Sequence, residues 1–369
     1  MKVALVNDYL KEYGGAERVL EALHDMYPDA PVFTLVYSPQ FLGPHKERFA
    51  SWDIRQSFLR FLPFNYKFIS LYRLIAPLVF KSFDFSGFDV IIVSATGAYC
   101  PNMIDKKQAK QICYCHTPPR YLYGYATARE WKKNKVLRFL GEYANHFLRM
   151  VDFTSSKHVD LFIANSENIA RRIKKFYRRD SIVIYPPVVS GNDVTTIKSE
   201  KRTYFLTGGR LARPKHIDLI IQTCNDLKIP LKVFGKGFAG YGDELTQLAG
   251  SSVSFLGEVS DEEKLELMRH AKAFIFAGED EDFGIIPVEA MSMGTPVIAY
   301  KSGGLLETVV EGKTGLFFSE LTVASLAQAI KKFQKLRFDP DVCAKYAQKF
   351  SYKVFTKSIS AQINIITSS

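Results

Sequence analysis

Short apolar runs that alternate with helical patterns constrain the fold of this chain more than any other feature. In the first half, strand-like runs near Val3 and Ile91 enclose a helical pattern from Ala16 to Tyr27. A second series starts at Thr203 and continues to the strand-like run that ends at Tyr300. This alternation is typical of βαβ units, which build parallel sheets. The sequence therefore predicts an α/β chain with two Rossmann-like, doubly wound parallel sheets.

A polar, turn-rich stretch after Pro186 and Pro187 marks the predicted boundary between two domains. The chain of 369 residues is long enough for two ordinary domains. We expect domains over 1–190 and 191–350, with a terminal helix over 351–369 that packs back toward the first domain. Doubly wound sheets bind ligands beyond the carboxyl ends of their strands, so we expect a site in a cleft between the domains.

The net charge indicates which kinds of partner to expect, and the cysteine content indicates the cellular compartment. Lys and Arg number 49 against 38 Asp and Glu, and the resulting charge of +11 favours nucleotide diphosphates, acidic lipids or nucleic acid. Five scattered cysteines indicate a reducing, cytoplasmic location. Cys113, Cys115 and His116 have no second cluster at ligand spacing, so we expect no zinc there. The first apolar run is too short for a signal-peptide core.

Glu281 and Glu289 frame the segment that carries the strongest chemical signal. The segment follows a strand-like run and enters a helix, with Pro287 in the first turn. The amides near Gly284 and Ile285 then lie at a helix start, which suits an anion such as diphosphate. We expect both glutamates near that end, with Glu289 in the first turn, as acceptors for sugar or ribose hydroxyls. Simple complementation of the helix dipole is the alternative.

Three further positions follow strand-like runs. Arg210 and Lys215, in GGRLARPK, can neutralise a leaving diphosphate, although a solvated basic loop fits equally well. Gly14 and Gly15 precede a helix and allow close approach of a phosphate or sugar, or they form a plain helix entry. His116 is placed to contact a sugar hydroxyl or position an acceptor, and a structural role is the alternative.

Together these positions resemble glycosyltransferase family 4, whose members have the two-domain GT-B fold, over nearly the whole chain. EDFGIIPVEAMSMGTPVIAYKSGG resembles the family's donor-site motif of two glutamates separated by seven residues. GGRLARPK resembles its diphosphate-binding pair, and GGAERVL its N-terminal glycine loop. CHTPPRYLYGY, ANSENIARRIKKFY and IYPPV look like bacterial mannosyltransferases that build lipid-linked O-antigen or exopolysaccharide repeats.

The resemblance implies a retaining hexosyltransferase that takes mannose from GDP-mannose, or a similar donor, and extends a lipid-linked glycan on its N-terminal, acceptor-side domain. It implies no metal ion or other cofactor. The implied roles are Arg210 and Lys215 at the diphosphate, Glu289 at the ribose, Glu281 with the backbone of Phe283, Gly284 and Ile285 at the sugar, Gly14 and Gly15 at the phosphate and sugar, and His116 near the reacting centre. Glu281 as a covalent nucleophile stays open.

Two other motifs compete with this interpretation. The glycines of 235–240, followed by Glu258, have the form of a dinucleotide fingerprint, but they do not follow the first strand of their domain. Asp280 and Asp282 have the D-x-D spacing by which some glycosyltransferases hold a divalent metal. A sugar-nucleotide epimerase of the same fold and a basic nucleic-acid-binding protein are the alternative functions, although no nucleic-acid-binding motif is present.

The segment 55–81 interleaves basic and aromatic residues and contains no acidic residue. Such a pattern suits an anionic membrane surface, and an ordinary basic helical face is the alternative. We therefore expect peripheral contact with the inner face of the cytoplasmic membrane. The residues that define the pattern are Arg55, Phe58, Arg60, Phe61, Phe64, Tyr66, Lys67, Phe68, Tyr72, Arg73, Phe80 and Lys81.

Overall fold

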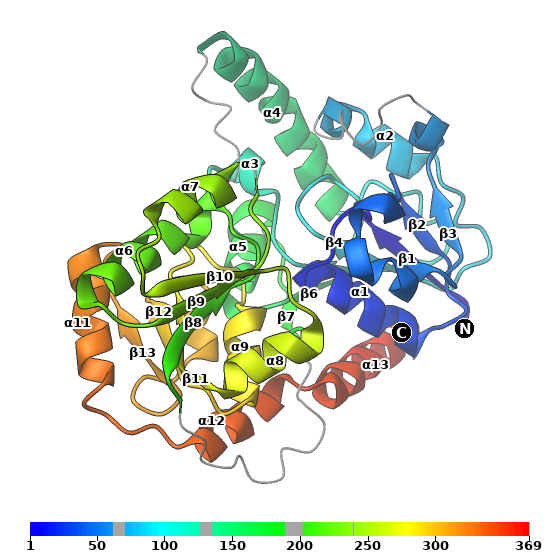
Figure 1. Cartoon of the computed structure of the whole chain (residues 1–369). Coiled ribbons are helices and arrows are strands. Elements are labelled where there is room, and N and C mark those ends of the chain that lie inside the picture. The colour runs from blue at the N-terminus through cyan, green and yellow to red at the C-terminus, as the bar shows by residue number, and fades with distance from the viewer. Residues whose placement is uncertain (62–70, 126–134, 189–201, 239, 369) are drawn as a thin grey trace. The chain divides into compact units, whose positions relative to one another are not determined.

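The computed structural model describes residues 1–61, 71–125, 135–188, 202–238 and 240–368, which form two compact units (Figure 1). The first unit holds the described residues of 1–125, 135–187 and 352–368. The second holds those of 188–351. Predicted membrane-contact residues Phe64, Tyr66, Lys67 and Phe68 lie outside the described residues.

The first unit is built on a seven-stranded sheet in which every adjacent pair of strands is parallel. The strand order is β3-β2-β1-β4-β5-β6-β7, so the direction of winding reverses between β1 and β4. Buried clusters lie on both faces, which is why the strands read as continuous apolar runs. The strands are β1 (Val3–Asn7), β2 (Val32–Thr34), β3 (Ile54–Gln56), β4 (Val90–Ala95), β5 (Lys110–Cys115), β6 (Leu161–Ala164) and β7 (Ile182–Val183).

Six α-helices of the described residues accompany this sheet, and one of them shows how the sequence sets a boundary. The side chain of Ser166 accepts a hydrogen bond from the Ile169 amide at 3.1 Å, which confirms the predicted N-cap. The helices are α1 (Gly15–Met26), α2 (Ala76–Lys81), α3 (Arg120–Tyr123), α4 (Lys135–Ser156), α5 (Glu167–Tyr177) and α13 (Tyr352–Ser368), with 3-10 turns η1 (Pro39–Phe41), η2 (Gly43–Phe49), η3 (Phe58–Phe61) and η4 (Leu71–Leu74).

The second unit has a six-stranded parallel sheet in the order β10-β9-β8-β11-β12-β13, and its winding reverses between β8 and β11. The prediction of two doubly wound parallel sheets is confirmed. The strands are β8 (Tyr204–Gly208), β9 (Leu231–Phe234), β10 (Val253–Gly257), β11 (Ala271–Phe276), β12 (Val297–Tyr300) and β13 (Gly315–Phe318). The helices are α6 (Ile217–Leu227), α7 (Tyr241–Leu248), α8 (Asp261–Arg269), α9 (Ile285–Ser292), α10 (Leu305–Thr308), α11 (Val323–Phe333) and α12 (Pro340–Ala347), with 3-10 turns η6 (Arg213–Lys215) and η7 (Gln348–Phe350).

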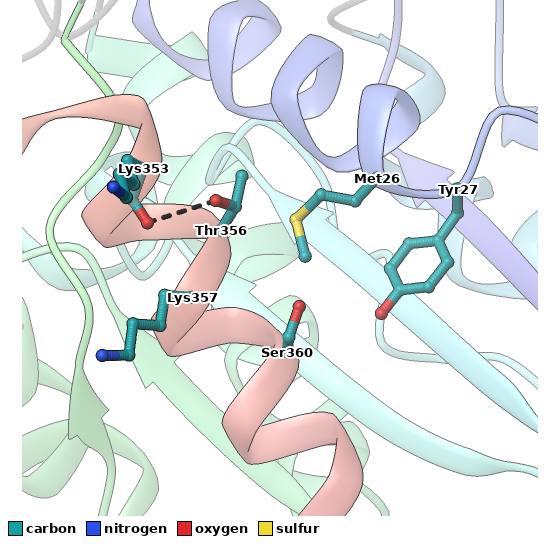
Figure 2. Close-up of a pocket in the computed structure, with 6 residues that line it drawn as sticks. All are labelled: Met26, Tyr27, Lys353, Thr356, Lys357 and Ser360. Carbon is teal, nitrogen blue, oxygen red and sulfur yellow. Dashed lines mark hydrogen bonds between the residues drawn. The ribbon is translucent and has the colours of Figure 1, made fainter.

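The terminal helix α13 belongs to the first unit although the second unit precedes it in sequence. Phe355, Ile359 and Ile363 recur every four residues on one helical face, and each is only 1% exposed in the core beside α1. Figure 2 shows α13 next to the end of α1, where Met26 and Tyr27 help to line a depression of about 450 Å³. No residue proposed for the donor or acceptor lines this depression.

We expect Phe355→Ala to lower the free energy of unfolding of the first unit by about 3–5 kcal/mol, because it leaves a cavity in a closed core. Urea unfolding followed by intrinsic fluorescence measures the loss. Val354→Ala is the matched control, because the neighbouring Val354 is 47% exposed. Equal stability of the two variants would show that α13 does not contribute to this core.

Candidate active site

Two loops of the second unit meet where the strand order reverses. One follows β8 and leads through η6 to α6, and the other follows β11 and leads to α9. Because β8 and β11 are adjacent and parallel, both loops leave the same edge of the sheet. The Glu279 amide donates to the Pro214 carbonyl at 2.9 Å and fixes one loop against the other. Such a switch point is where doubly wound sheets bind ligands.

Lys215 and Glu281 form an ion pair across these two loops. The ammonium of Lys215 donates to the carboxylate of Glu281 and also lies 5.0 Å from the centre of the Phe276 ring. The two side chains are partly accessible, with exposed fractions of 29% for Lys215 and 17% for Glu281. The structure therefore brings together two of the predicted site residues, at a position that a ligand can reach.

A pair of glycines after β12 holds the Glu281 loop in place. The Gly304 amide donates to the Glu281 carbonyl at 2.8 Å. A Cβ atom on Gly303 would lie 2.2 Å from the Glu281 carbonyl oxygen, and one on Gly304 would lie 2.4 Å from that of Asp282. Gly303 also has a φ of 56°, which favours glycine. The sequence-based predictions do not include this positioning role, for which two adjacent glycines soon after a strand are the signal.

Helix α9 begins where the sequence predicts. Gly284 is its N-cap with a φ of 92°, and Pro287 lies in the first turn. The side chain of Phe283 is buried against the Phe350 ring, with 5.3 Å between the ring centres. This contact anchors the residue that precedes the cap. The first amides of α9, including that of Ile285, have no acceptor within their own helix, as at any helix start.

The prediction that Glu289 lies in the first turn of α9 is wrong. Glu289 is the fifth residue of the helix, and no acidic residue lies in the first turn. Its side chain is 1% exposed and accepts a hydrogen bond from Lys264 of α8 at 2.9 Å. Lys264 also donates to Asp261 at 2.9 Å. With 3.6 residues per turn, the fifth position lies more than one turn along the helix from its start, and there its side chain contacts α8.

Arg210 lies in the loop after β8 and is exposed. Its guanidinium lies 5.8 Å from the centre of the Phe238 ring. A Cβ atom on the preceding Gly209 would lie 2.4 Å from a methyl carbon of Ile286, so the loop packs directly on the start of α9. Arg213 of the same loop instead forms an ion pair with Glu244 at 2.5 Å.

Two glycines of 235–240 have packing roles, whereas Gly240 has a φ of 80° and open space around it. A Cβ atom on Gly235 would lie 1.8 Å from the Gly209 carbonyl oxygen, and one on Gly237 would lie 2.7 Å from Gly242 Cα. Ala239 lies outside the described residues. Across the described part of the chain, no three His, Cys, Asp or Glu side chains cluster in a way that could hold a metal ion.

Asp8 occupies the corresponding switch point of the first unit. It follows β1, and its carboxylate accepts from the Thr96 amide at 2.5 Å, the Thr96 hydroxyl at 2.7 Å and the Tyr99 amide at 3.0 Å. These bonds tie the loops after β1 and β4 together. Burial raises the pKa of Asp8 to about 6, against the lowering effect of these hydrogen bonds. The sequence analysis gave Asp8 no role of its own, although an acidic residue directly after a first strand is a readable signal.

Gly14 and Gly15 join the loop after β1 to α1. Gly14 has an extended φ of −155°, and a Cβ atom there would meet only the Glu17 carboxylate at 3.5 Å. Neither strain nor crowding therefore requires glycine at this position. The Gly14 amide donates to the Glu17 carboxylate at 2.9 Å, and Gly15 is the first residue of the helix.

His116 follows β5 on the same edge of the first sheet. Its Nε2 atom lies 2.9 Å from the Ser94 hydroxyl, and its carbonyl accepts from the Asn165 side chain at 3.0 Å. Burial lowers the pKa of His116 to about 3. The imidazole is therefore neutral at physiological pH, which excludes it as a cationic contact for phosphate.

Only some of the described residues in the segment 55–81 are exposed. Phe58 and Phe61 are 56% and 73% exposed, but Tyr72 and Phe80 are buried, so their prediction as surface aromatics is wrong. Arg73 donates to the Ala98 carbonyl at 3.2 Å and stacks on a tyrosine of α3. Among the described residues, no helix combines the length and the apolar character needed to cross a membrane.

Two family models match consecutive parts of this chain. The model described as Glycosyltransferase Family 4 matches residues 13–190, and that described as Glycosyl transferases group 1 matches residues 192–350. The chain belongs to glycosyltransferase family 4. Both models describe glycosyl transfer, and they favour it over the epimerase and the nucleic-acid-binding protein that the sequence left open.

Similar proteins cover the chain over most of its length. The alpha-1,3/1,6-mannosyltransferase ALG2 of Mus musculus is 26% identical over 94% of this chain and 92% of its own, and that of Homo sapiens is 26% identical over 74% and 72%. Among solved structures, Anabaena Alr3699/HepE in complex with UDP has a TM-score of 0.69 at 18% identity over 99% of this chain and 100% of its own. Sucrose-phosphate synthase from Thermosynechococcus elongatus has a TM-score of 0.74 at 16% identity, with both chains fully covered. The chain described here, a family 4 enzyme, therefore has the GT-B fold.

We expect Glu289→Gln to lower the free energy of unfolding by up to about 3–5 kcal/mol, because it removes one partner of the buried Lys264 ammonium. Asp261 remains as a second partner and reduces the loss. Chemical unfolding of Glu289→Gln, Lys264→Met and the double variant measures the coupling. The double variant should be more stable than the sum of the two single losses implies, and strictly additive losses would contradict the pairing.

Proposed function

We propose that this family 4 enzyme transfers mannose from GDP-mannose, with retention of configuration, to a lipid-linked glycan in surface-polysaccharide synthesis. The observation that carries the proposal is the Lys215–Glu281 ion pair at the switch point of the second sheet. The names of the mannosyltransferase relatives support the choice of sugar. The UDP complex of a protein with the same fold supports a nucleotide-diphosphate donor.

Arg210 and Lys215 bind the donor diphosphate in this proposal. The departing diphosphate gains negative charge as the glycosidic bond breaks, and fixed cations stabilise that charge most in the transition state. Because these cations supply the neutralisation, the proposal requires no metal ion. Lys215 is paired with Glu281 in the structure. The diphosphate therefore replaces a carboxylate as the partner of Lys215.

Glu281 is then available to the transferred sugar. Its released carboxylate accepts hydrogen bonds from sugar hydroxyls, together with the backbone of Phe283, Gly284 and Ile285 at the start of α9. We propose that Glu289 contacts the ribose, with Lys264 holding its carboxylate in one orientation. In this proposal Glu281 changes its partner when the donor binds, whereas Glu289 keeps Lys264 as its partner.

In the first unit, Gly14 and Gly15 contribute backbone contacts to the donor phosphate and sugar. The extended, uncrowded backbone of Gly14 supports this role, because a side chain there would only obstruct a ligand. His116, with its lowered pKa, is a weak base at neutral pH and contributes a neutral hydrogen-bonding ring. A phosphate oxygen of the donor then takes the acceptor's proton as the acceptor attacks the face that the diphosphate leaves.

Peripheral contact with the inner face of the cytoplasmic membrane completes the proposal, because a lipid-linked acceptor is presented there. The exposed Phe58 and Phe61 and the exposed Arg60 of η3 support contact through 55–81.

We expect Arg210→Ala to lower kcat/KM for GDP-mannose by about 10²–10³-fold, because it removes a cation that stabilises the leaving diphosphate. Steady-state transfer assays with a panel of nucleotide sugars measure the loss and test the donor. Arg213→Ala is the matched control, because Arg213 lies in the same loop but pairs with Glu244. Full activity of Arg210→Ala would overturn the diphosphate assignment, and a clear preference for another nucleotide sugar would overturn GDP-mannose alone.

A further inference from the structure

Helix α4 belongs to a folded unit, yet it exposes an apolar face. Phe139, Tyr143 and Phe147 are 74%, 63% and 46% exposed, and Met150 is 48% exposed. Their spacing of four, four and three residues places them along one face of the helix. The opposite face contributes buried residues, including Leu148. The exposed face therefore extends over about three turns of a helix that is anchored on its other side.

A groove is lined by residues of α4 and α2 and by Leu74 of η4. Its volume is about 460 Å³, which is within the range of small-ligand sites. Leu74, Pro77 and Leu78 line one side, and Tyr143 and Phe147 line the other. Among the described residues that line it, the phenol of Tyr143 is the only polar side-chain group. Leu74 and Leu78 are themselves 50% and 69% exposed, so the groove and the α4 face form one surface.

The charges on the same elements indicate what covers this surface. Arg60 of η3, Lys81 of α2 and Arg138 of α4 are exposed. Glu142 and the buried Asp152 are the acidic residues on the described part of α4. Exposed basic residues on these elements, together with an exposed aromatic and aliphatic face, match a layer that is anionic at its surface and apolar beneath.

A second copy of the chain fits this surface less well. A two-fold contact would bring the basic residues of one copy against the same surface of the other, and like charges repel. A nucleic acid would satisfy the charges but leave the leucines and phenylalanines without apolar partners. An anionic bilayer satisfies both, because its hydrocarbon accepts the apolar side chains while its phosphates contact the arginines and lysines.

We propose that α4 and α2 form a membrane-inserting surface, and that the groove between them takes a hydrocarbon chain of a lipid in an anionic bilayer. The surface extends beyond the segment 55–81 to a helix that the sequence analysis did not connect with membranes. It rests on exposure and charge in the first unit and does not depend on the donor assignment.

Co-sedimentation with vesicles tests the surface. The full-length protein should bind vesicles of phosphatidylcholine with phosphatidylglycerol, and bind phosphatidylcholine vesicles at least tenfold more weakly. Phe139→Ser/Tyr143→Ser should lose at least tenfold in binding to the anionic vesicles, whereas Val354→Ser, which changes an exposed apolar residue on α13, should not. Equal binding of the two variants would overturn the surface, and so would concentration-dependent dimerisation without vesicle binding.

Quenching by lipids brominated in their acyl chains tests the groove. A tryptophan introduced by Phe147→Trp should lose much of its added fluorescence in anionic vesicles, and one introduced by Val354→Trp should not. Equal quenching at the two positions would overturn the assignment of a hydrocarbon chain to the groove. Hydrolysis of GDP-mannose in lipid-free solution should be the same in Phe139→Ser/Tyr143→Ser and the parent, so this readout separates failure of the surface from failure of the donor assignment.

Discussion

The ion pair between Lys215 and Glu281 is the interaction on which the account of this enzyme depends. It joins the loops after β8 and β11, which leave the sheet where its winding reverses. Gly303 and Gly304 make this geometry possible, because any side chain there would displace the backbone of the Glu281 loop. In the proposed mechanism, the pair supplies a cation for the diphosphate and a carboxylate for the sugar.

The first unit uses a carboxylate for a related purpose. Asp8 ties together the loops after β1 and β4 at the reversal point of its own sheet, but it is fully buried and bonded to Thr96 and Tyr99. Glu281 instead remains partly accessible and is paired with a lysine that is also partly exposed. A buried, multiply bonded carboxylate fixes a loop, whereas a partly exposed ion pair can exchange partners. This difference explains why the exchange is assigned to the second unit.

Patterns within one segment were readable from the sequence, and contacts between segments were not. Apolar runs predict the parallel sheets, and Ser166 predicts a helix start, because both features depend on residues that are neighbours in the sequence. The pairing of Glu289 with Lys264 joins residues from two helices, and nothing in either helix reveals the partner. For the same reason, the interleaved pattern of 55–81 did not distinguish buried Tyr72 and Phe80 from exposed Phe58. Helix α4 itself is absent from the sequence-based predictions, and helical periodicity does not in any case show which side of a helix is covered.

Calorimetric titration of GDP into Glu281→Gln tests the central claim most directly. If Glu281 competes with the diphosphate for Lys215, this variant should bind GDP more tightly than the parent, by about tenfold or about 1.4 kcal/mol, while its rate of sugar transfer falls. Glu279→Gln is the matched control, because Glu279 lies two residues before Glu281 and its carboxylate is paired with the His216 ring. Unchanged or weaker GDP binding by Glu281→Gln, with transfer intact, would contradict the account.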